Sequence, residues 1–178
     1  MKMKLPRNLP TLALVLAVSA CATGPASPIA PASPASKVAP TLRLANVIAA
    51  SKGADDRELA VQPLRDPEVQ DLRETSATAI ASRDYATAAE ALNQALLITP
   101  DDPAILQERA EVALLQADNE RAETLAKRAF DLGSKVGPLC RRHWATIEQA
   151  RLARGLQKEA QSAHVQIEAC TVAGLDRM

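Results

Sequence analysis

Apolar residues change their spacing along the 178-residue chain, and the changes divide it into segments of different kinds. One unbroken apolar run covers residues 12–18, and residues 22–40 are nearly all Ala, Pro and Ser. Helix signals become regular from about residue 66. The pattern therefore predicts a short apolar leader over 1–20, a spacer over 21–40 and one helical domain over 66–174.

Capping signals predict two helical hairpins in the first part of this domain. Residues 66–68, Asp-Pro-Glu, combine an N-cap, a proline suited to the first helical position and an acid in the first turn, and Asp102-Pro103 repeats the arrangement. Between them, Asp84 can cap a second helix that Pro100 stops. The same layout recurs from 103 to Gly133, with a turn at 118–119 and Gly133 as the C-terminal cap.

The lead-in segment 41–65 has a weaker pattern. Leu44, Val47 and Ile48 could form one face of a short helix, but Gly53 and Pro63 interrupt the segment. We expect partial order here, with the lead-in lying against the first helix of the domain.

The N-terminus has the features of an export signal. The apolar run 12–18 follows basic residues and is far shorter than the roughly 20 residues that span a bilayer. Residues 18–21, Val-Ser-Ala-Cys, resemble the lipobox of bacterial lipoproteins, which implies that Cys21 is acylated and becomes the mature N-terminus. By the same resemblance, Ala22 after the cysteine indicates the outer membrane. An ordinary secretory signal with a chance cysteine is the alternative.

The spacer has a proline at every third position. Pro25, Pro28, Pro31 and Pro34 match the three-residue turn of a polyproline II helix. Such a segment cannot pack a core, and we expect it to act as a tether. A proline-rich recognition motif is the alternative.

Small residues recur along the domain at positions that resemble the tetratricopeptide repeat. Two antiparallel helices pack this closely only where the side chain at their crossing is small. The second half of the repeat has an aromatic residue, Ala, a large apolar residue, Ala and Pro, and this chain has Tyr85, Ala88, Leu92, Ala95 and Pro100 at those spacings. The family's period is about 34 residues, and advancing by it from Ala88 and Ala95 reaches Ala122 and Ala129. Ala110 falls where the first helix of the repeat has a small residue.

A third unit resembles the repeat after an insertion near 133–139. Trp144, Ile147, Gly155 and Ala160 match its Trp, apolar, turn and Ala positions. The resemblance implies an all-α fold, an α-solenoid of about three helical hairpins. The chain departs from the family pattern at Leu72, Ser76, Leu106, Arg109 and Asn119. An unrelated helical bundle is the alternative.

Composition argues against several classes of function. The chain has 21 basic and 21 acidic residues, a formal net charge of zero, and only three aromatic residues. It therefore lacks the basic stripe and the stacking platform that nucleic acid would need. The sequence has no Gly-rich phosphate loop and no recognisable nucleophile context, so we expect no catalysis, no cofactor and no small-molecule substrate.

Cys140 and Cys170 would begin the first helix and end the second helix of the third unit. Antiparallel helices place such ends side by side, and export to an oxidising compartment favours a disulfide. Two free thiols are one alternative. A zinc site that also uses His143 and His164 is the other, although residues six apart on a helix point about 120° away from each other.

The resemblance also implies a function. In tetratricopeptide arrays, the first helices line a groove that holds a peptide or a partner helix. We therefore expect a lipid-anchored adaptor or scaffold at the periplasmic face of the outer membrane, serving envelope, secretion or pilus assembly. A self-associating structural lipoprotein is the alternative, and a periplasmic enzyme accessory is less favoured. The groove positions map to Gln70, Arg73, Gln107, Glu111, Arg142 and Gln149.

Overall fold

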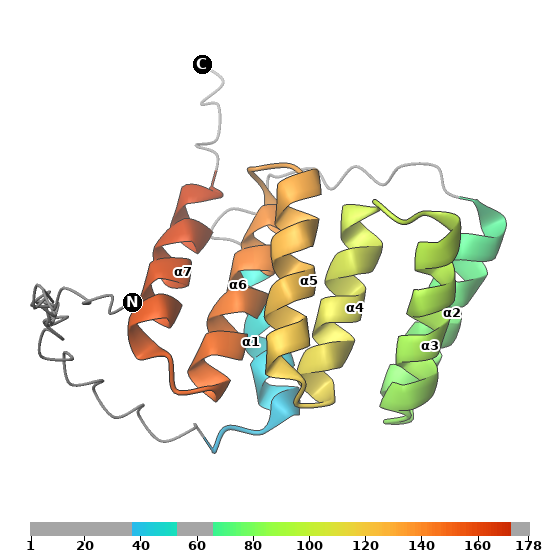
Figure 1. Ribbon diagram of the computed structural model, residues 1–178, viewed down its shortest axis with the longest axis horizontal. Helices are drawn as coiled ribbons and strands as arrows, with labels where there is room; N and C mark the ends of the chain where they lie inside the picture. Colours follow the sequence, from blue (N-terminus) through green and yellow to red (C-terminus); the bar gives the residue numbers. More distant parts are fainter. Residues whose placement is uncertain (1–36, 53–65, 172–178) are drawn as a thin grey trace, which may run out of the picture. The chain divides into compact units, whose positions relative to one another are not determined.

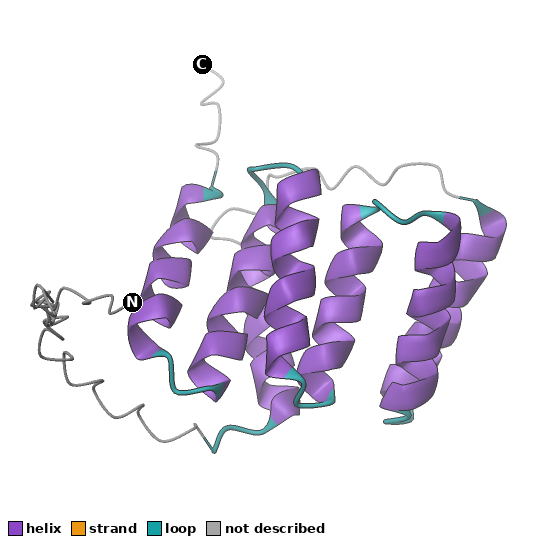
Figure 2. Cartoon of the chain, viewed as in Figure 1, coloured by secondary structure: helices purple, strands orange, loops and turns teal. Residues whose placement is uncertain are grey.

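A computed structural model describes residues 37–52 and 66–171, all within one compact unit that covers 32–178. The leader, the predicted lipidation site Cys21, nearly all of the tether and the second part of the lead-in lie outside the described residues. The described residues form helices and short turns, without a strand (Figure 2). None of these helices has the length and the apolar character needed to cross a lipid bilayer.

The helices form an all-α repeat array, which confirms the predicted fold class (Figure 1). Three antiparallel hairpins follow one another, α2 with α3, α4 with α5 and α6 with α7, and a further helix, α1, precedes them. The bounds are α1 Pro40–Lys52, α2 Pro67–Ala81, α3 Tyr85–Ile98, α4 Pro103–Leu115, α5 Asn119–Leu132, α6 Pro138–Ala153 and α7 Gln157–Ala169.

Aspartate side chains cap four of the helices. Asp66, Asp84 and Asp102 accept hydrogen bonds from backbone N–H groups in the first turns of α2, α3 and α4, at the predicted positions. Asp118, predicted in a turn, caps α5 in the same way. Each cap satisfies backbone donors that the helix itself leaves without a partner.

The same backbone turn closes all three hairpins. Its central residue has a positive φ, at Arg83 (64°), Ala117 (60°) and Gly155 (76°). The next residue donates its N–H to a carbonyl five positions back, at distances of 2.8–2.9 Å. The spacings are 117 − 83 = 34 and 155 − 117 = 38 residues, so the third hairpin carries an extra four residues. This agrees with the insertion expected near 133–139.

Alanines fill the contacts between paired helices. Ala88, Ala122 and Ala160 follow the three turns at equivalent positions, and all three are buried. Ala95, Ala110 and Ala129 are fully buried as well. Tyr85 packs at the edge of the α2–α3 core, while Trp144 lies against Phe130 with ring centroids 4.9 Å apart. Small side chains therefore lie where the helices approach most closely.

The lead-in helix α1 lies elsewhere than expected. It packs against α6 and, to a smaller extent, α4 (Figure 1). The prediction placed it against the first helix of the domain, α2, and was wrong. Sequence neighbours are a poor guide here because the surface that buries Val47 is built from residues of α4, α5 and α6.

Candidate protein-binding groove

A cleft opens across the first helices of all three hairpins. Its volume is about 390 Å³. Most of its walls come from α2 and α4, and a single residue of α6, Arg142, completes it. We call it the charged cleft; its lining residues are Gln70, Arg73, Glu74, Ser76, Ala77, Ile80, Glu108, Glu111 and Arg142.

One ion pair joins α2 to α4 inside the charged cleft. The guanidinium of Arg73 donates from Nε to Glu108 Oε2 at 2.9 Å and from Nη2 to Glu108 Oε1. The two side chains are 20% and 23% exposed, so the pair is still reachable from solvent. The hydrogen bond to Glu108 raises the pKa of Arg73. A bidentate pair of this kind fixes the orientation of both side chains.

A second ion pair joins α4 to α6 and is more deeply buried. Arg142 donates from Nε and Nη2 to the two carboxylate oxygens of Glu111. Burial raises the pKa of the Glu111 carboxyl, although Arg142 acts in the opposite direction. Burial alone would lower the pKa of Arg142, but the attraction of Glu111 outweighs it and raises that pKa.

A buried polar network supports the second pair from behind. Gln107 donates from Nε2 to Glu111 at 2.8 Å and to the Thr146 hydroxyl at 2.7 Å. Its carbonyl oxygen therefore faces His143, whose Nδ1 lies 2.8 Å away and donates to it. These bonds hold the α4–α6 ion pair in one geometry, because each member restricts the rotamer of the next.

His143 is fully buried, and its environment opposes protonation. Burial lowers its pKa to about 4, with smaller contributions from the positive charges of Arg142 and Lys135. Its Nε2 has no hydrogen-bond partner among the described residues. A Cβ added at Gly133 would come within 3.4 Å of this nitrogen and within 2.9 Å of the Ala129 carbonyl, so the approach of the chain here requires glycine.

Helix α1 covers another part of the predicted groove, the surface that α4 and α6 form. Arg43 of α1 donates from Nη1 to the Gln149 carbonyl at 3.1 Å, and Asn46 contacts the Gln149 side chain. At the other end of α1, Arg141 donates from Nη2 to the Ser51 carbonyl at 3.0 Å. These contacts pair the start of α1 with the end of α6, so the two helices run antiparallel.

The predicted groove residues divide into two sets. Gln70, Arg73, Glu111 and Arg142 come together as lining of the charged cleft. Gln107 is instead fully buried beneath it, and Gln149 is largely buried, with α1 bonded to it. Both therefore serve contacts within the chain, because each first helix has neighbours on more than one side.

Several lining residues were missed from the sequence. Glu74 lies four positions after Gln70, and Ala77 and Ile80 lie four and seven positions after Arg73, which is the spacing of one helical face. Glu108 stands 35 positions beyond Arg73, close to the repeat period. Extending the two predicted positions along their faces would have found these residues.

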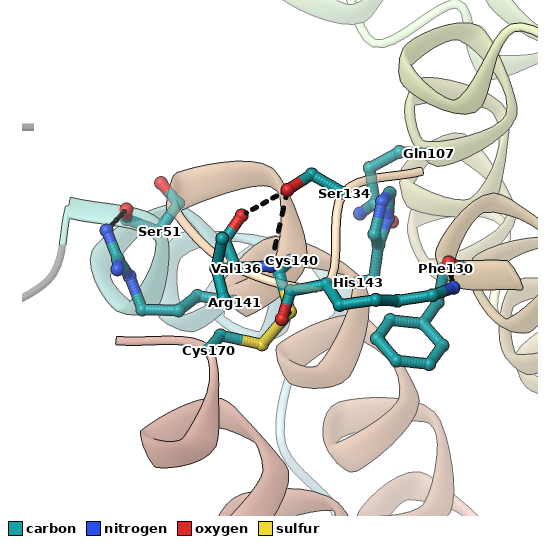
Figure 3. Close-up of a disulfide and its surroundings, with 10 residues drawn as sticks. Ser51, Gln107, Phe130, Ser134, Val136, Cys140, Arg141, His143 and Cys170 are labelled. Atoms are coloured by element: carbon teal, nitrogen blue, oxygen red, sulfur yellow. Dashed lines mark hydrogen bonds between the residues drawn. A yellow bond between two sulfur atoms is a disulfide. The ribbon is translucent and has the colours of Figure 1, made fainter. Parts of the chain in front are cut away.

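Cys140 and Cys170 are joined in a disulfide, with Cα atoms 5.7 Å apart. Figure 3 shows the bond between the start of α6 and the end of α7, with Arg141 directed to Ser51 and His143 to Gln107. The N–H of Gly137 also donates to the Cys170 carbonyl at 2.8 Å. Both sulfurs are used in this bond, and His164 lies instead against Glu148, with Nδ1 3.0 Å from its carboxylate.

The chain is similar to a domain of known structure. The globular C-terminal domain of LpoP from P. aeruginosa shares 30% sequence identity with it, at a TM-score of 0.57. The match covers 59% of this chain and 99% of the LpoP domain. This chain belongs to the family of that domain. No protein-family model and no curated protein matches it.

The match to the LpoP domain extends over a whole domain. Because nearly all of the LpoP domain is matched, the likeness extends over its whole architecture and not to a single hairpin. The remaining 41% of this chain (100 − 59) lies outside the match.

Proposed function

We propose that this chain is a lipid-anchored adaptor at the periplasmic face of the outer membrane, and that its charged cleft binds a segment of a partner protein. In this proposal Cys21 carries the anchor, residues 22–40 form the tether, and the hairpins are of tetratricopeptide type. The adaptor would serve envelope, secretion or pilus assembly.

The charged cleft is the observation that carries the proposal. It is formed by the first helices of successive hairpins, the side on which tetratricopeptide arrays bind peptides and helices. The 34-residue spacing of the first two turns and the buried alanines after all three support the assignment to that type.

The charges of the cleft indicate the chemistry of the partner. Arg73 and Arg142 alternate with Glu108 and Glu111, and each cation is held by a carboxylate. A polyanion such as nucleic acid would meet as much repulsion as attraction here. A polypeptide segment with side chains of both signs complements this surface.

The first test blocks the cleft without disturbing the pairs. Ala77 lines the cleft and is exposed, so Ala77→Arg fills the space with a long side chain while the fold is retained. We expect at least a tenfold loss of the proteins captured with the anchored chain from crosslinked envelopes. Reversal of the Glu111–Arg142 pair is unsuitable, because it would disturb a buried network.

The matched control is Ala86→Arg on α3, an exposed alanine that does not line the cleft. It adds the same charge and the same side chain to a helix surface, so recovery should equal that of the unaltered chain. Equal recovery with both variants, quantified by mass spectrometry, would exclude the charged cleft as the binding site.

A further inference from the structure

Helix α1 has the geometry of a helix bound in a groove. It lies on α4 and α6, which are the first helices of their hairpins. The charged cleft is also lined by first helices. Its two ends are fixed by Arg43 against Gln149 and by Ser51 against Arg141. We call the surface beneath it the α1 site; it includes Ala113, Leu114, Ala145, Gln149 and Ala150.

Few side chains hold α1 in place. Of its thirteen residues only Arg43 and Val47 are buried, whereas ten residues of α4 are. Leu42 and Ile48 of α1 are 54% and 43% exposed. The buried set of α1 is therefore much smaller than that of α4 and equal in number to that of α7, so α1 is a peripheral helix of the array.

The two buried residues define what the site recognises. The Arg43 guanidinium reaches a backbone carbonyl of α6, and Val47, one turn later, is fully buried in an apolar cluster to which α4 and α6 contribute Ala113, Leu114, Ala145 and Ala150. Residues four apart lie on the same face of a helix. A basic residue followed four positions later by a branched aliphatic residue is thus the pattern that fits.

We propose that the α1 site is a helix-binding site which α1 occupies within the chain, and that a partner's amphipathic helix with this basic–aliphatic pattern binds there when α1 separates. The inference deepens the proposed adaptor function and adds a second section to its binding groove. The two sections adjoin, because Arg141 bonds to α1 and the next residue, Arg142, lines the charged cleft.

The test uses α1 itself as the probe. Val47→Asp in the full-length chain places a charge in the enclosed position and releases α1, while every residue of the α1 site is retained. A synthetic peptide of residues 37–52 should then bind this variant at least tenfold more tightly than it binds the unaltered chain, as measured by calorimetry. The same peptide carrying Val47→Asp should not bind.

Ile48→Asp is the matched control, since it adds the same charge at the neighbouring, exposed position. It should leave peptide binding at the level of the unaltered chain. If the Val47→Asp chain keeps its helical circular dichroism and cooperative unfolding but binds the peptide no better, the proposal is wrong.

Hydrogen exchange of the unaltered chain gives a second, independent test. Amides of α1 should exchange faster than those of α6, through an opening that leaves the hairpins protected. Equal protection of α1 and α6, or complete unfolding of the Val47→Asp chain, would show that α1 is a permanent part of the core. Ala77→Arg should leave peptide binding unchanged, so failure of the charged cleft and failure of the α1 site are distinguishable.

Discussion

At the scale of single residues, His143 couples the fold to pH. Its ring is fully buried, donates one hydrogen bond to Gln107 and has a pKa of about 4. In the unfolded chain the pKa of the same side chain is about 6.5. Because the folded state holds the neutral ring, the unfolded state takes up the proton first as the pH falls.

The stability contributed by neutral His143 is fully present above pH 6.5 and is lost progressively between pH 6.5 and pH 4. We expect the free energy of unfolding to fall by about 2 kcal/mol between pH 7 and pH 5 on account of this residue. Urea unfolding at the two pH values measures the change. His143→Gln should remove that part of the pH dependence.

His164→Gln provides the comparison, because His164 is half exposed on α7. That variant should keep the loss of stability that buried His143 produces between pH 7 and pH 5. If the His143→Gln chain loses as much stability between pH 7 and pH 5 as the unaltered chain does, the loss does not come from His143.

At the scale of elements, the third hairpin is the one with a covalent link. It ends the described array, so α7 has a neighbouring hairpin on one side only, and its two helices start without a side-chain cap. The disulfide joins residues 30 positions apart. Closing a loop of this length restricts the unfolded chain and stabilises the folded state by about 3–4 kcal/mol in the chain-entropy account.

The double variant Cys140→Ala, Cys170→Ala should therefore lower the free energy of unfolding by about 3–4 kcal/mol. Guanidinium unfolding of the oxidised chain and of the variant measures the difference. A reducing agent should destabilise the unaltered chain and leave the variant unchanged. A destabilisation well below 1 kcal/mol would show that the unfolded chain is restricted by other means.

At the scale of the whole molecule, the proposed function depends on the anchor. Cys21→Ala removes the thiol that the lipobox-like sequence would present for acylation, and it changes no residue of the described domain. We expect the chain to move from the membrane fraction to the soluble periplasmic fraction, since acyl chains supply the membrane affinity. Cell fractionation with immunoblotting checks this.

Ser19→Thr is a milder change in the same segment and should leave most of the chain in the membrane fraction. If the unaltered chain itself appears in the soluble periplasmic fraction, the lipoprotein assignment fails. Far-ultraviolet circular dichroism of the released chain should be unchanged, because the described helices begin at Pro40.

The sequence by itself determined the hairpins, because the signals for them are local. An aspartate caps backbone groups within three residues of itself, and a proline that follows a helix stops it at or before the preceding residue, so Asp84 and Pro100 could be interpreted without knowledge of the fold. The buried alanines and the closeness of Cys140 to Cys170 followed once the helices were paired.

Only the tertiary structure decided the position of α1 and the burial of the groove residues. Arg43 meets a carbonyl 106 positions away, and no periodicity within α1 specifies that surface. Gln107 and Gln149 are polar residues on first helices, as Gln70 is, yet two of the three are buried. Which polar side chains stay in solvent depends on what packs over them, and that is a property of the assembled helices.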